Sequence, residues 1–470
     1  MLVSPCIVYH PREVWIMRIL VVGDGKVGHT LAESLTRENH EVVIIDRDEE
    51  VLQHCQDTLD VMCIQGNGAN AKTLLEADVS TADIVISATA SDETNMLCCL
   101  VAKRLGARYT IARIRDPEYI ESLTLLQREL GIDLTINPER ATAMEISRLL
   151  RFPFASNIEP FAKGQVEMVE FRALEADSIV DCPMKQLSIK YPAIPRVLYA
   201  AVEREGQVHI PNGDFIIRPG DRVHVAGDMI TITDYFRFLG RNAIKIKKVM
   251  LLGGGRISYY LARMIIAMGI HVTIIEIDPQ TAADLSEMLP QADVILGDGT
   301  DQELLTQEAI ENMDAFVCLC DRDEENLMTG LYAARQGVPK VIVKNNRIAY
   351  EEILSELGLD SMVSPRAITC DTILRYVRAR VNGKGTGVER LYRLMEGKAE
   401  ALEFIAREGD PYIGVALKNL HVRKNTLVAV IVRGSKVIVP FGNDHIEAGD
   451  RVIIMAGESG VSDLNEVIRP

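Results

Sequence analysis

Residues 18–46 read Arg18-Ile-Leu-Val-Val-Gly-Asp-Gly-Lys-Val-Gly-His-Thr-Leu-Ala-Glu-Ser-Leu-Thr-Arg-Glu-Asn-His-Glu-Val-Val-Ile-Ile-Asp46. This stretch carries the strongest signal for how the chain folds. The apolar run Ile19–Val22 predicts a buried strand, and Val42–Ile45 predicts a second one. Between these runs, apolar residues recur at helical spacing from Val27 to Leu35. The order of strand, glycine turn, helix, strand and acid predicts a βαβ unit that binds a nucleotide.

Three glycines and one acid carry this prediction. Gly23 allows the tight turn, Gly25 lets the backbone approach a pyrophosphate, and Gly28 lets the helix pack closely on the sheet. Asp46 follows the last glycine by 46 − 28 = 18 residues, where a carboxylate accepts hydrogen bonds from both ribose hydroxyls and repels a 2′-phosphate. The other loop residues are Asp24, Lys26 and Val27. The alternative interpretation is an empty structural turn.

Length, composition and charge limit the classes of protein to which the chain can belong. A chain of 470 residues predicts three or four domains. The net charge of −16 argues against nucleic acid as a partner, because binding to phosphates needs a basic face. The longest apolar candidate for a membrane span, Val249–Ile277, is interrupted by glycines and charged residues.

The cysteines and the N-terminus carry no recognisable motif. The nine cysteines are scattered, and the sequence contains no CxxC pair, no HExxH motif and no His/Cys cluster with metal-ligand spacing. We therefore expect no metal site and reduced thiols in the cytosol. Residues 1–16 do not resemble a signal peptide. We expect Met17 to be the working start and residues 1–16 to be a non-native extension, which an intact-mass measurement would decide.

The chain repeats itself with a shift of 253 − 23 = 230 residues. A second strand and turn appear at Val249–Ser258, and Glu276 takes the place of Asp46. The match continues through later elements: Gly66-Asn67-Gly68 with Gly297-Asp298-Gly299, and Asp92-Glu93-Thr94-Asn95 with Asp323-Glu324-Glu325-Asn326. The second loop contains Gly253, Gly254, Gly255, Arg256 and Ile257.

A smaller unit follows each nucleotide-type half. Turn sequences such as Pro219-Gly220-Asp221 and Ala448-Gly449-Asp450 precede apolar β-rich runs. We expect an α/β fold with two Rossmann-like parallel-sheet domains, each followed by a small α+β domain. The predicted linkers are 151–164 and 382–387. The predicted domains cover residues 17–139 and 248–366 for the nucleotide-binding units, and 159–243 and 384–470 for the small units.

This tandem order, with the complete loop Gly23–Gly28, Asp46, Gly66-Asn67-Gly68 and the Pro-Gly-Asp turns, resembles the regulators of potassium conductance family from Met17 to Pro470. The resemblance implies a non-enzymatic regulatory subunit, peripheral on the cytoplasmic face of the cell inner membrane. It implies a homo-oligomeric ring that binds NAD⁺ or NADH, and also ATP or ADP, and gates a Trk-type membrane potassium transporter. None of this transport role follows from composition or periodicity.

The resemblance also assigns roles to residues outside the first loop. It implies that Asn67 and Gly68 lie beside the adenosine, that Thr89 approaches the ligand backbone, and that Arg113 offers a cation to the phosphates. In the second half it assigns the same functions to Gly253–Ile257, Glu276 and Gly299. Ser258 replaces the third glycine there and adds a side chain where helix and strand should pack closely. The second loop therefore has two interpretations, a second nucleotide site or a structural turn. In the same way, Arg256 is either a phosphate ligand or a solvated turn residue.

An NAD-dependent oxidoreductase is the alternative function, because it shares the first motif. Hydride transfer needs a proton donor or acceptor beside the nicotinamide. No Tyr-x-x-x-Lys pair occurs, and the histidines fall mostly at strand starts and turns. The acids Asp92 and Glu93 are interpreted as charges at a helix N-terminus, with divalent-cation binding as the alternative. Ligand sensing therefore fits the sequence better than turnover does.

Overall fold

The computed structural model describes residues 16–119, 122–241, 246–346, 359, 361–382, 388–394, 399–423, 425–457 and 464–469. The predicted N-terminal extension lies outside the described residues except for Ile16. The chain divides into two compact units, Met1–Asn137 and Pro138–Pro470. Among the described residues, we find no helix that combines the length and the apolar character needed to cross a bilayer.

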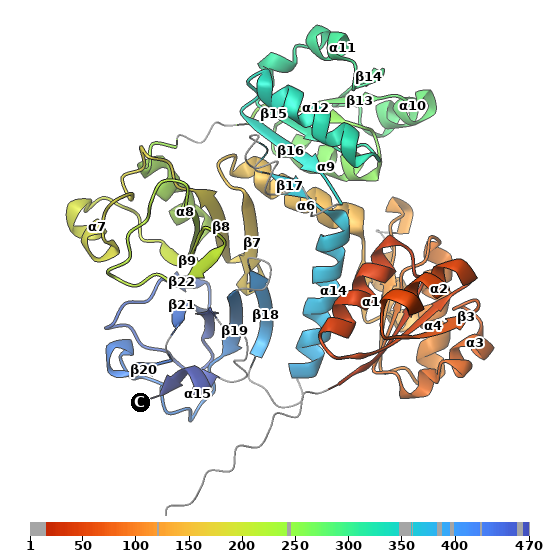
Figure 1. Ribbon diagram of the computed structural model, residues 1–470, viewed down its shortest axis with the longest axis horizontal. Helices are drawn as coiled ribbons and strands as arrows, with labels where there is room; N and C mark the ends of the chain where they lie inside the picture. The colour runs from red at the N-terminus through yellow and green to blue at the C-terminus, as the bar shows by residue number, and fades with distance from the viewer. Residues whose placement is uncertain are drawn as a thin grey trace, which may run out of the picture. The chain divides into compact units, whose positions relative to one another are not determined.

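The first unit is a parallel sheet with helices between its strands (Figure 1). The strand order is β3-β2-β1-β4-β5-β6, which is the order of a dinucleotide-binding doubly wound fold. Buried residues of β1, β2 and β4, such as Leu20, Val43 and Val85, pack against the helices as one apolar core. The elements are β1 (Arg18–Val22), α1 (Lys26–Arg37), β2 (Glu41–Asp46), α2 (Glu49–Thr58), β3 (Met62–Gln65), α3 (Ala71–Glu76), β4 (Ile84–Ser87), α4 (Asp92–Arg104), β5 (Tyr109–Arg113), α5 (Leu123–Leu130) and β6 (Leu134–Ile136).

The second unit contains a second parallel sheet of the same order, β14-β13-β12-β15-β16-β17. Each glycine loop follows the central strand of its sheet, β1 or β12, so the two halves place their loops at equivalent positions. Its elements are β12 (Lys248–Leu252), α9 (Arg256–Ile266), β13 (His271–Glu276), α10 (Pro279–Met288), β14 (Asp293–Leu296), α11 (Gln302–Gln307), β15 (Ala315–Cys318), α12 (Asp323–Arg335), β16 (Lys340–Lys344) and β17 (Met362–Val363).

Two five-stranded antiparallel sheets complete the second unit. Their orders are β10-β9-β11-β8-β7 and β18-β19-β23-β21-β22. The first group of elements is α6 (Pro138–Arg151), β7 (Asn157–Phe161), β8 (Val166–Arg172), α7 (Met184–Lys190), β9 (Leu198–Arg204), β10 (Gln207–His209), β11 (Arg222–Gly227) and α8 (Met229–Phe238). The second group is α14 (Pro365–Asn382), β18 (Val388–Leu394), β19 (Ala399–Ile405), β20 (His421–Val422), β21 (Thr426–Arg433), β22 (Lys436–Ile438), β23 (Arg451–Ala456), α15 (Leu464–Val467) and β24 (Ile468–Arg469).

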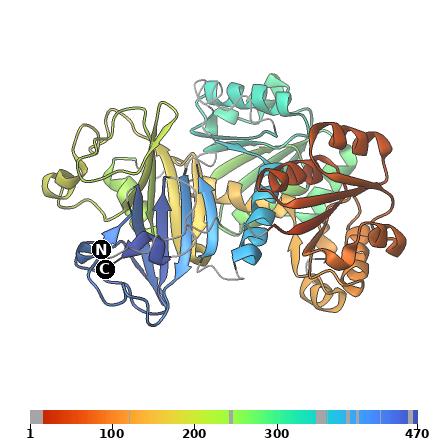
Figure 2. The same ribbon diagram turned by 60° about the horizontal axis from the view of Figure 1, so that its bottom comes forward.

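The two antiparallel sheets lie side by side (Figure 2). Their interface is apolar and rich in small residues. Ala200 and Ala226 from the first sheet lie in one buried cluster with Ala401, Ala429 and Val430 from the second. Small side chains let two sheets approach closely while they exclude water. The predicted α/β class, with two Rossmann-like parallel sheets each followed by a small α+β unit, is confirmed.

One predicted linker was wrong. The segment 151–164 contains β7, which pairs with β8 along its whole length. The segment is rich in proline, phenylalanine and asparagine, a composition that favours a linker. Its Pro160 cannot donate a hydrogen bond to a neighbouring strand. The structure places β7 at the edge of its sheet, where proline is tolerated. The second predicted linker, 382–387, lies outside the described residues except for Asn382.

Candidate nucleotide site

The first glycine loop has the geometry that its sequence predicts. Gly23 has a φ of +95°, which favours glycine, and a Cβ on Gly28 would lie 1.9 Å from the Gly23 carbonyl oxygen. A Cβ on Gly25 would meet nothing within 4 Å, so the loop is open at that residue. Gly25 is also the N-cap of α1, where a glycine offers no side-chain oxygen to the first helical N–H groups. The exposed Lys26 is the first residue of that helix. An anion thus has access to the positive end of α1.

Asp46 ends β2 and its carboxylate is held by two backbone N–H groups. Oδ2 accepts a hydrogen bond from the Asp24 N–H at 2.7 Å, and Oδ1 accepts one from the Asp48 N–H at 3.0 Å. Each carboxylate oxygen has a second lone pair, so this arrangement orients the acid without using up its capacity to accept hydrogen bonds. The acid therefore lies against the glycine loop, as its spacing in the sequence predicts.

The turn after β3 lies against the central strand. A Cβ on Gly68 would lie 2.1 Å from Cγ1 of Val22, which ends β1, so only glycine fits there. The Asn67 side chain accepts a hydrogen bond from the Ala69 N–H at 3.1 Å. This turn therefore follows the same edge of the sheet as the glycine loop.

Asn95 positions two of the predicted site residues, a role that was not predicted from the sequence. This fully buried side chain, on α4, accepts hydrogen bonds from the Thr89 N–H at 2.9 Å and the Thr89 hydroxyl at 2.7 Å. It also donates to the carbonyls of Thr89 at 3.2 Å and Arg113 at 2.8 Å. It therefore fixes the ends of β4 and β5, where Thr89 and Arg113 lie. The internal repeat could have pointed to this residue, because it matches Asn95 with Asn326. Asn326 makes the equivalent hydrogen bonds to the backbone of Cys320 and Lys344.

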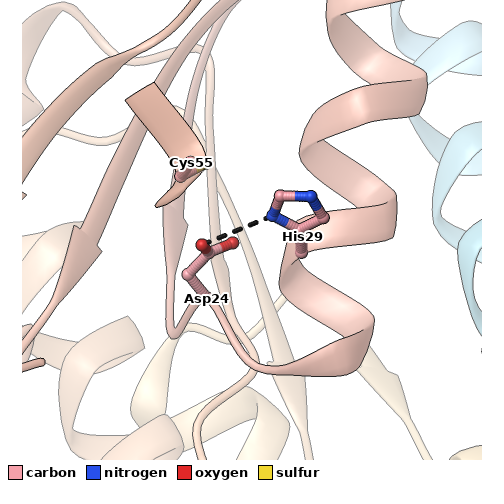
Figure 3. Close-up of side chains that lie close together, drawn as sticks. All are labelled: Asp24, His29 and Cys55. Atoms are coloured by element: carbon pink, nitrogen blue, oxygen red, sulfur yellow. Dashed lines mark ion pairs between the residues drawn. The ribbon is translucent and has the colours of Figure 1, made fainter. Parts of the chain in front are cut away.

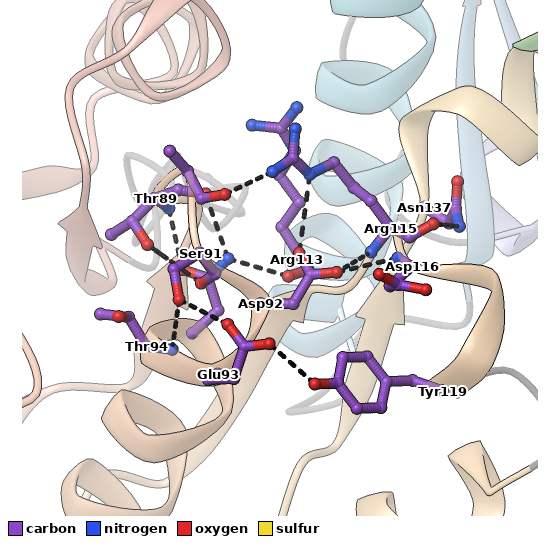
Figure 4. A network of polar contacts seen from close by, with 12 residues as sticks. Thr89, Ser91, Asp92, Glu93, Thr94, Arg113, Arg115, Asp116, Tyr119 and Asn137 are labelled. Carbon is purple, nitrogen blue, oxygen red and sulfur yellow. Dashed lines mark hydrogen bonds and ion pairs between the residues drawn. The ribbon is translucent and has the colours of Figure 1, made fainter. Parts of the chain in front are cut away.

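Acidic residues at the start of α4 form a connected network (Figure 4). The Asp92 carboxylate accepts hydrogen bonds from the backbone N–H groups of Arg115 at 2.7 Å and Asp116 at 2.8 Å. Glu93 accepts hydrogen bonds from the Tyr119 hydroxyl and from the Ser91 hydroxyl, each at 2.7 Å. These hydrogen bonds lower the pKa of Glu93 to about 2, and the bond from Tyr119 has the larger effect. The interpretation of Asp92 and Glu93 as N-terminal helix charges is confirmed, since both lie in the first turn of α4.

The second half keeps the acid but changes its surroundings. Glu276 accepts hydrogen bonds from the Gly254 N–H at 2.5 Å and the Asp278 N–H at 2.8 Å, which repeats the arrangement of Asp46. Ser258 is buried, and its hydroxyl donates to the Gly253 carbonyl, so a hydrogen bond accommodates the side chain that replaces the third glycine. In the second loop, Gly255 and Arg256 are exposed and Ile257 is buried. In the later turn, a Cβ on Gly299 would lie 1.9 Å from Cδ1 of Leu252.

The cation at the end of the fifth strand also differs between the halves. Lys344 stands where the first half has Arg113, and its side chain is buried. Its ammonium group donates to the Leu319 carbonyl at 3.2 Å and contacts the Asp321 carboxylate at 3.3 Å. The Lys344 ammonium group is therefore already paired with a carbonyl and a carboxylate of the protein.

A carboxylate, an imidazole and a thiol meet beside the first loop (Figure 3). Oδ2 of Asp24 lies 3.5 Å from Nδ1 of His29 on α1, and Cys55 on α2 lies close to both. Burial raises the pKa of the Asp24 carboxyl, although His29 opposes the shift. Burial also raises the pKa of the Cys55 and Cys63 thiols. This cluster was not predicted from the sequence, because its members come from the loop, from α1 and from α2.

Comparison with known proteins identifies the family. The TrkA-N domain profile matches residues 19–138 and again residues 249–365, and the TrkA-C domain profile matches residues 401–469. The Trk system potassium uptake protein TrkA homolog 1 of Methanosarcina mazei is 34% identical over 461 residues, which cover 96% of this chain and 100% of the relative. The Trk system potassium uptake protein TrkA of Vibrio alginolyticus is 32% identical over 461 residues, with coverage of 97% and 99%.

A solved structure has a similar fold. The GsuK channel bound to NAD superposes with a TM-score of 0.62 at 16% identity, over 95% of this chain and 79% of that one. At this identity the likeness concerns the fold, which agrees with the two Rossmann-like sheets described above. The predicted family resemblance is confirmed by the profile matches and by the curated relatives. The chain belongs to the TrkA family of Trk system potassium uptake proteins.

Proposed function

We propose that this chain is a nucleotide-binding regulatory subunit that gates a Trk-type membrane potassium transporter in response to NAD(H) and adenine nucleotides. The observation that carries the proposal is the orientation of Asp46, whose two carboxylate oxygens are each held by a backbone N–H group. The names of the relatives support the transport system, and a channel of this fold has been solved with NAD bound. The subunit is not an enzyme and acts from the cytoplasmic face of the membrane.

The proposed ligand lies along the edge of the first parallel sheet. Asp46 accepts hydrogen bonds from the ribose hydroxyls, while the N–H groups of Gly23–Gly28 and the N-terminus of α1 bind the pyrophosphate. Asn67 and Gly68 lie beside the adenosine, and Thr89 approaches the ligand backbone. Arg113 offers its guanidinium to the phosphates. The proposed nucleotide domains are residues 17–139 and 248–366, and the proposed small domains are 159–243 and 384–470.

Gating follows from a difference in affinity between two arrangements of the subunit. A ligand shifts such an equilibrium only by the ratio of its affinities for the two states. NAD⁺, NADH and ADP differ in charge and size, so each favours a different spacing between neighbouring subunits in a homo-oligomeric ring. The ring transmits this bias to the transporter.

The binding test compares two neighbouring carboxylates. We expect Asp46→Asn to weaken NADH binding by roughly 10- to 100-fold, because asparagine keeps one acceptor oxygen and one charged hydrogen bond, worth about 1.5 to 3 kcal/mol, is lost. Wild type should reject NADPH strongly, and Asp46→Asn should narrow that preference because the repulsion of the 2′-phosphate disappears. Asp48→Asn is the matched control, since Asp48 caps α2 and asparagine is an equally good cap. Calorimetric titration measures the loss of NADH affinity and the preference for NADH over NADPH. An unchanged NADH affinity in Asp46→Asn would contradict the assignment of Asp46 to the ribose.

The transport test uses cells that lack this chain. We expect rubidium uptake to be restored by wild type and by Asp48→Asn, and to lose its response to nucleotide with Asp46→Asn. Circular dichroism checks that both variants fold. Uptake that is independent of the chain, together with hydride turnover by the purified protein, would instead support the oxidoreductase alternative.

A further inference from the structure

The cluster beside the first loop combines three kinds of metal ligand. Asp24 lies in the loop, His29 on α1 and Cys55 on α2, and Figure 3 shows their side chains converging. Their ligand atoms all lie within 4.8 Å of one another. Cys63 on β3 provides a second thiol near Cys55, but it lies outside this group of three. No other group of three such ligands occurs among the residues that the structure describes.

The distances suit a tetrahedral ion. Zinc binds carboxylate oxygen and imidazole nitrogen at about 2.0 to 2.2 Å, so two such ligands in a tetrahedral site lie about 3.4 Å apart. The observed separation between Asp24 Oδ2 and His29 Nδ1 is 3.5 Å. A thiolate ligand would lie about 3.5 Å from each of them. The Cys55 Sγ lies within 4.8 Å of both atoms, so it must approach them by at most about 1.3 Å when an ion binds.

The Asp24 carboxylate lacks a full set of partners. Asp24 is only 5% exposed, and its Oδ1 atom is buried with no hydrogen-bond partner among the described residues. A buried carboxylate oxygen without a donor costs free energy. A bound cation would satisfy it. The His29 side chain is 30% exposed, so an ion from solvent has access at that edge of the cluster.

The repeat shows that packing alone does not require these residues. The equivalent positions in the second half are Gly254, Tyr259 and Leu285. Leu285 is buried and fills the space that a Cβ on Gly254 would occupy, since its Cδ1 would lie 2.5 Å away. The same fold therefore closes this space with one apolar side chain in the second half. The first half carries a carboxylate, an imidazole and a thiol there instead.

We propose that Asp24, His29 and Cys55 bind a divalent ion of the zinc class, with the fourth position of the tetrahedral site open. Mixed sulfur, nitrogen and oxygen ligands favour zinc-like ions over Mg²⁺ and Ca²⁺, which prefer oxygen alone. This proposal stands against the expectation from sequence spacing that the chain has no metal site. It also predicts a coupling, which rests on the proposed function. Because the Asp24 N–H is held by Asp46, an ion on Asp24 biases the loop, and metal and nucleotide alter each other's affinity reciprocally.

The test uses the full chain, reduced, stripped of metal and free of nucleotide. Titration with Co²⁺ should give the visible bands of a tetrahedral site and a thiolate-to-cobalt charge-transfer band, saturating at one ion per chain, and Zn²⁺ should displace the Co²⁺. Asp24→Gly, His29→Tyr and Cys55→Leu each install the residue found in the second half. Each should weaken binding by more than the roughly 10- to 100-fold typical of losing a second-shell partner.

Matched controls carry the same residue types outside the cluster. Cys320→Ser and His271→Asn should leave the cobalt bands unchanged. Cys55→Ser serves as a second variant if Cys55→Leu fails to fold. The proposal is overturned if no charge-transfer band forms, if the three cluster variants bind as wild type does, or if Cys320→Ser removes the band. A Cys55–Cys63 disulfide in the native protein without metal uptake would also overturn it.

NADH titrations with and without Zn²⁺ separate this proposal from the proposed function. Metal binding without NADH binding would keep the metal site and reject the nucleotide site. NADH binding without metal binding would do the reverse. If both bind, an NADH affinity that Zn²⁺ does not change would reject the coupling alone.

Discussion

Gly28 is required by the distance between α1 and the loop that precedes it. An alanine Cβ would lie 1.9 Å from the Gly23 carbonyl oxygen, so Gly28→Ala must displace either the helix or the loop. We expect this variant to lower the free energy of unfolding by about 1 to 3 kcal/mol, as overpacking usually does, and to weaken nucleotide binding as well. Urea denaturation measures the first effect and calorimetric titration the second.

The control lies three residues earlier in the same loop. Gly25 has a φ of −68°, and its added Cβ would meet nothing within 4 Å. Gly25→Ala should therefore leave stability nearly unchanged but weaken NADH binding, because the methyl group stands where the pyrophosphate approaches. Equal stability losses in the two variants would show that the described loop geometry does not govern the fold.

His224 gives a residue-level prediction about acid sensitivity. Burial lowers its pKa from 6.5 to about 4, with Glu203 opposing the shift and Arg222 adding to it, and the Glu170 carboxylate lies 3.9 Å away. The unfolded chain therefore binds a proton between pH 6.5 and 4 that the folded chain does not, and stability falls as pH falls through this window. The shift corresponds to about 3 kcal/mol. His224→Gln should flatten this part of the curve of unfolding free energy against pH. Parallel curves for variant and wild type would contradict the prediction.

At the scale of elements, one buried amide joins two strand ends. Asn95 on α4 bonds Thr89 after β4 and Arg113 at the end of β5, and Asn326 does the same in the second half. Asn95→Asp keeps the acceptor oxygen but removes the donors to two carbonyls. We expect it to cost about 2 to 4 kcal/mol and to raise amide exchange in β4 and β5, because buried partners are left unpaired. Exchange that rises equally over the whole chain would instead indicate a general loss of stability.

Elements with a local signal could be predicted, and those defined by tertiary contacts could not. The loop at Gly23 and the acid Asp46 follow from spacing along the chain, and the structure brings them into hydrogen-bonding contact. β7 was missed because Pro160 resembles a break unless the strand is known to lie at an edge. Asn95 was visible only as a member of the repeat. The cluster of Asp24, His29 and Cys55 has no sequence spacing that marks it.

In the molecule as a whole, the parallel-sheet fold occurs twice, and the residues around its glycine loop differ between the two copies. Both halves present an acid to a glycine loop, through Asp46 and Glu276. The second half replaces the third glycine with Ser258 and engages Lys344 with the Leu319 carbonyl. A cation held in this way offers less to a phosphate, because moving it would leave a buried carbonyl without its donor. The two halves should therefore differ in nucleotide affinity.

Calorimetric titration of the full chain with NADH tests this difference. We expect one tight class of site per chain, and a second class that is weaker by at least about tenfold, which corresponds to about 1.4 kcal/mol. Asp46→Ala should remove the tight class, whereas Glu276→Ala should leave it intact and affect only the weaker one. If the tight class disappears in Glu276→Ala instead, the second half is the principal sensor and the roles of the halves are reversed. Two equal classes in wild type would mean that neither Ser258 nor the bonding of Lys344 distinguishes the sites.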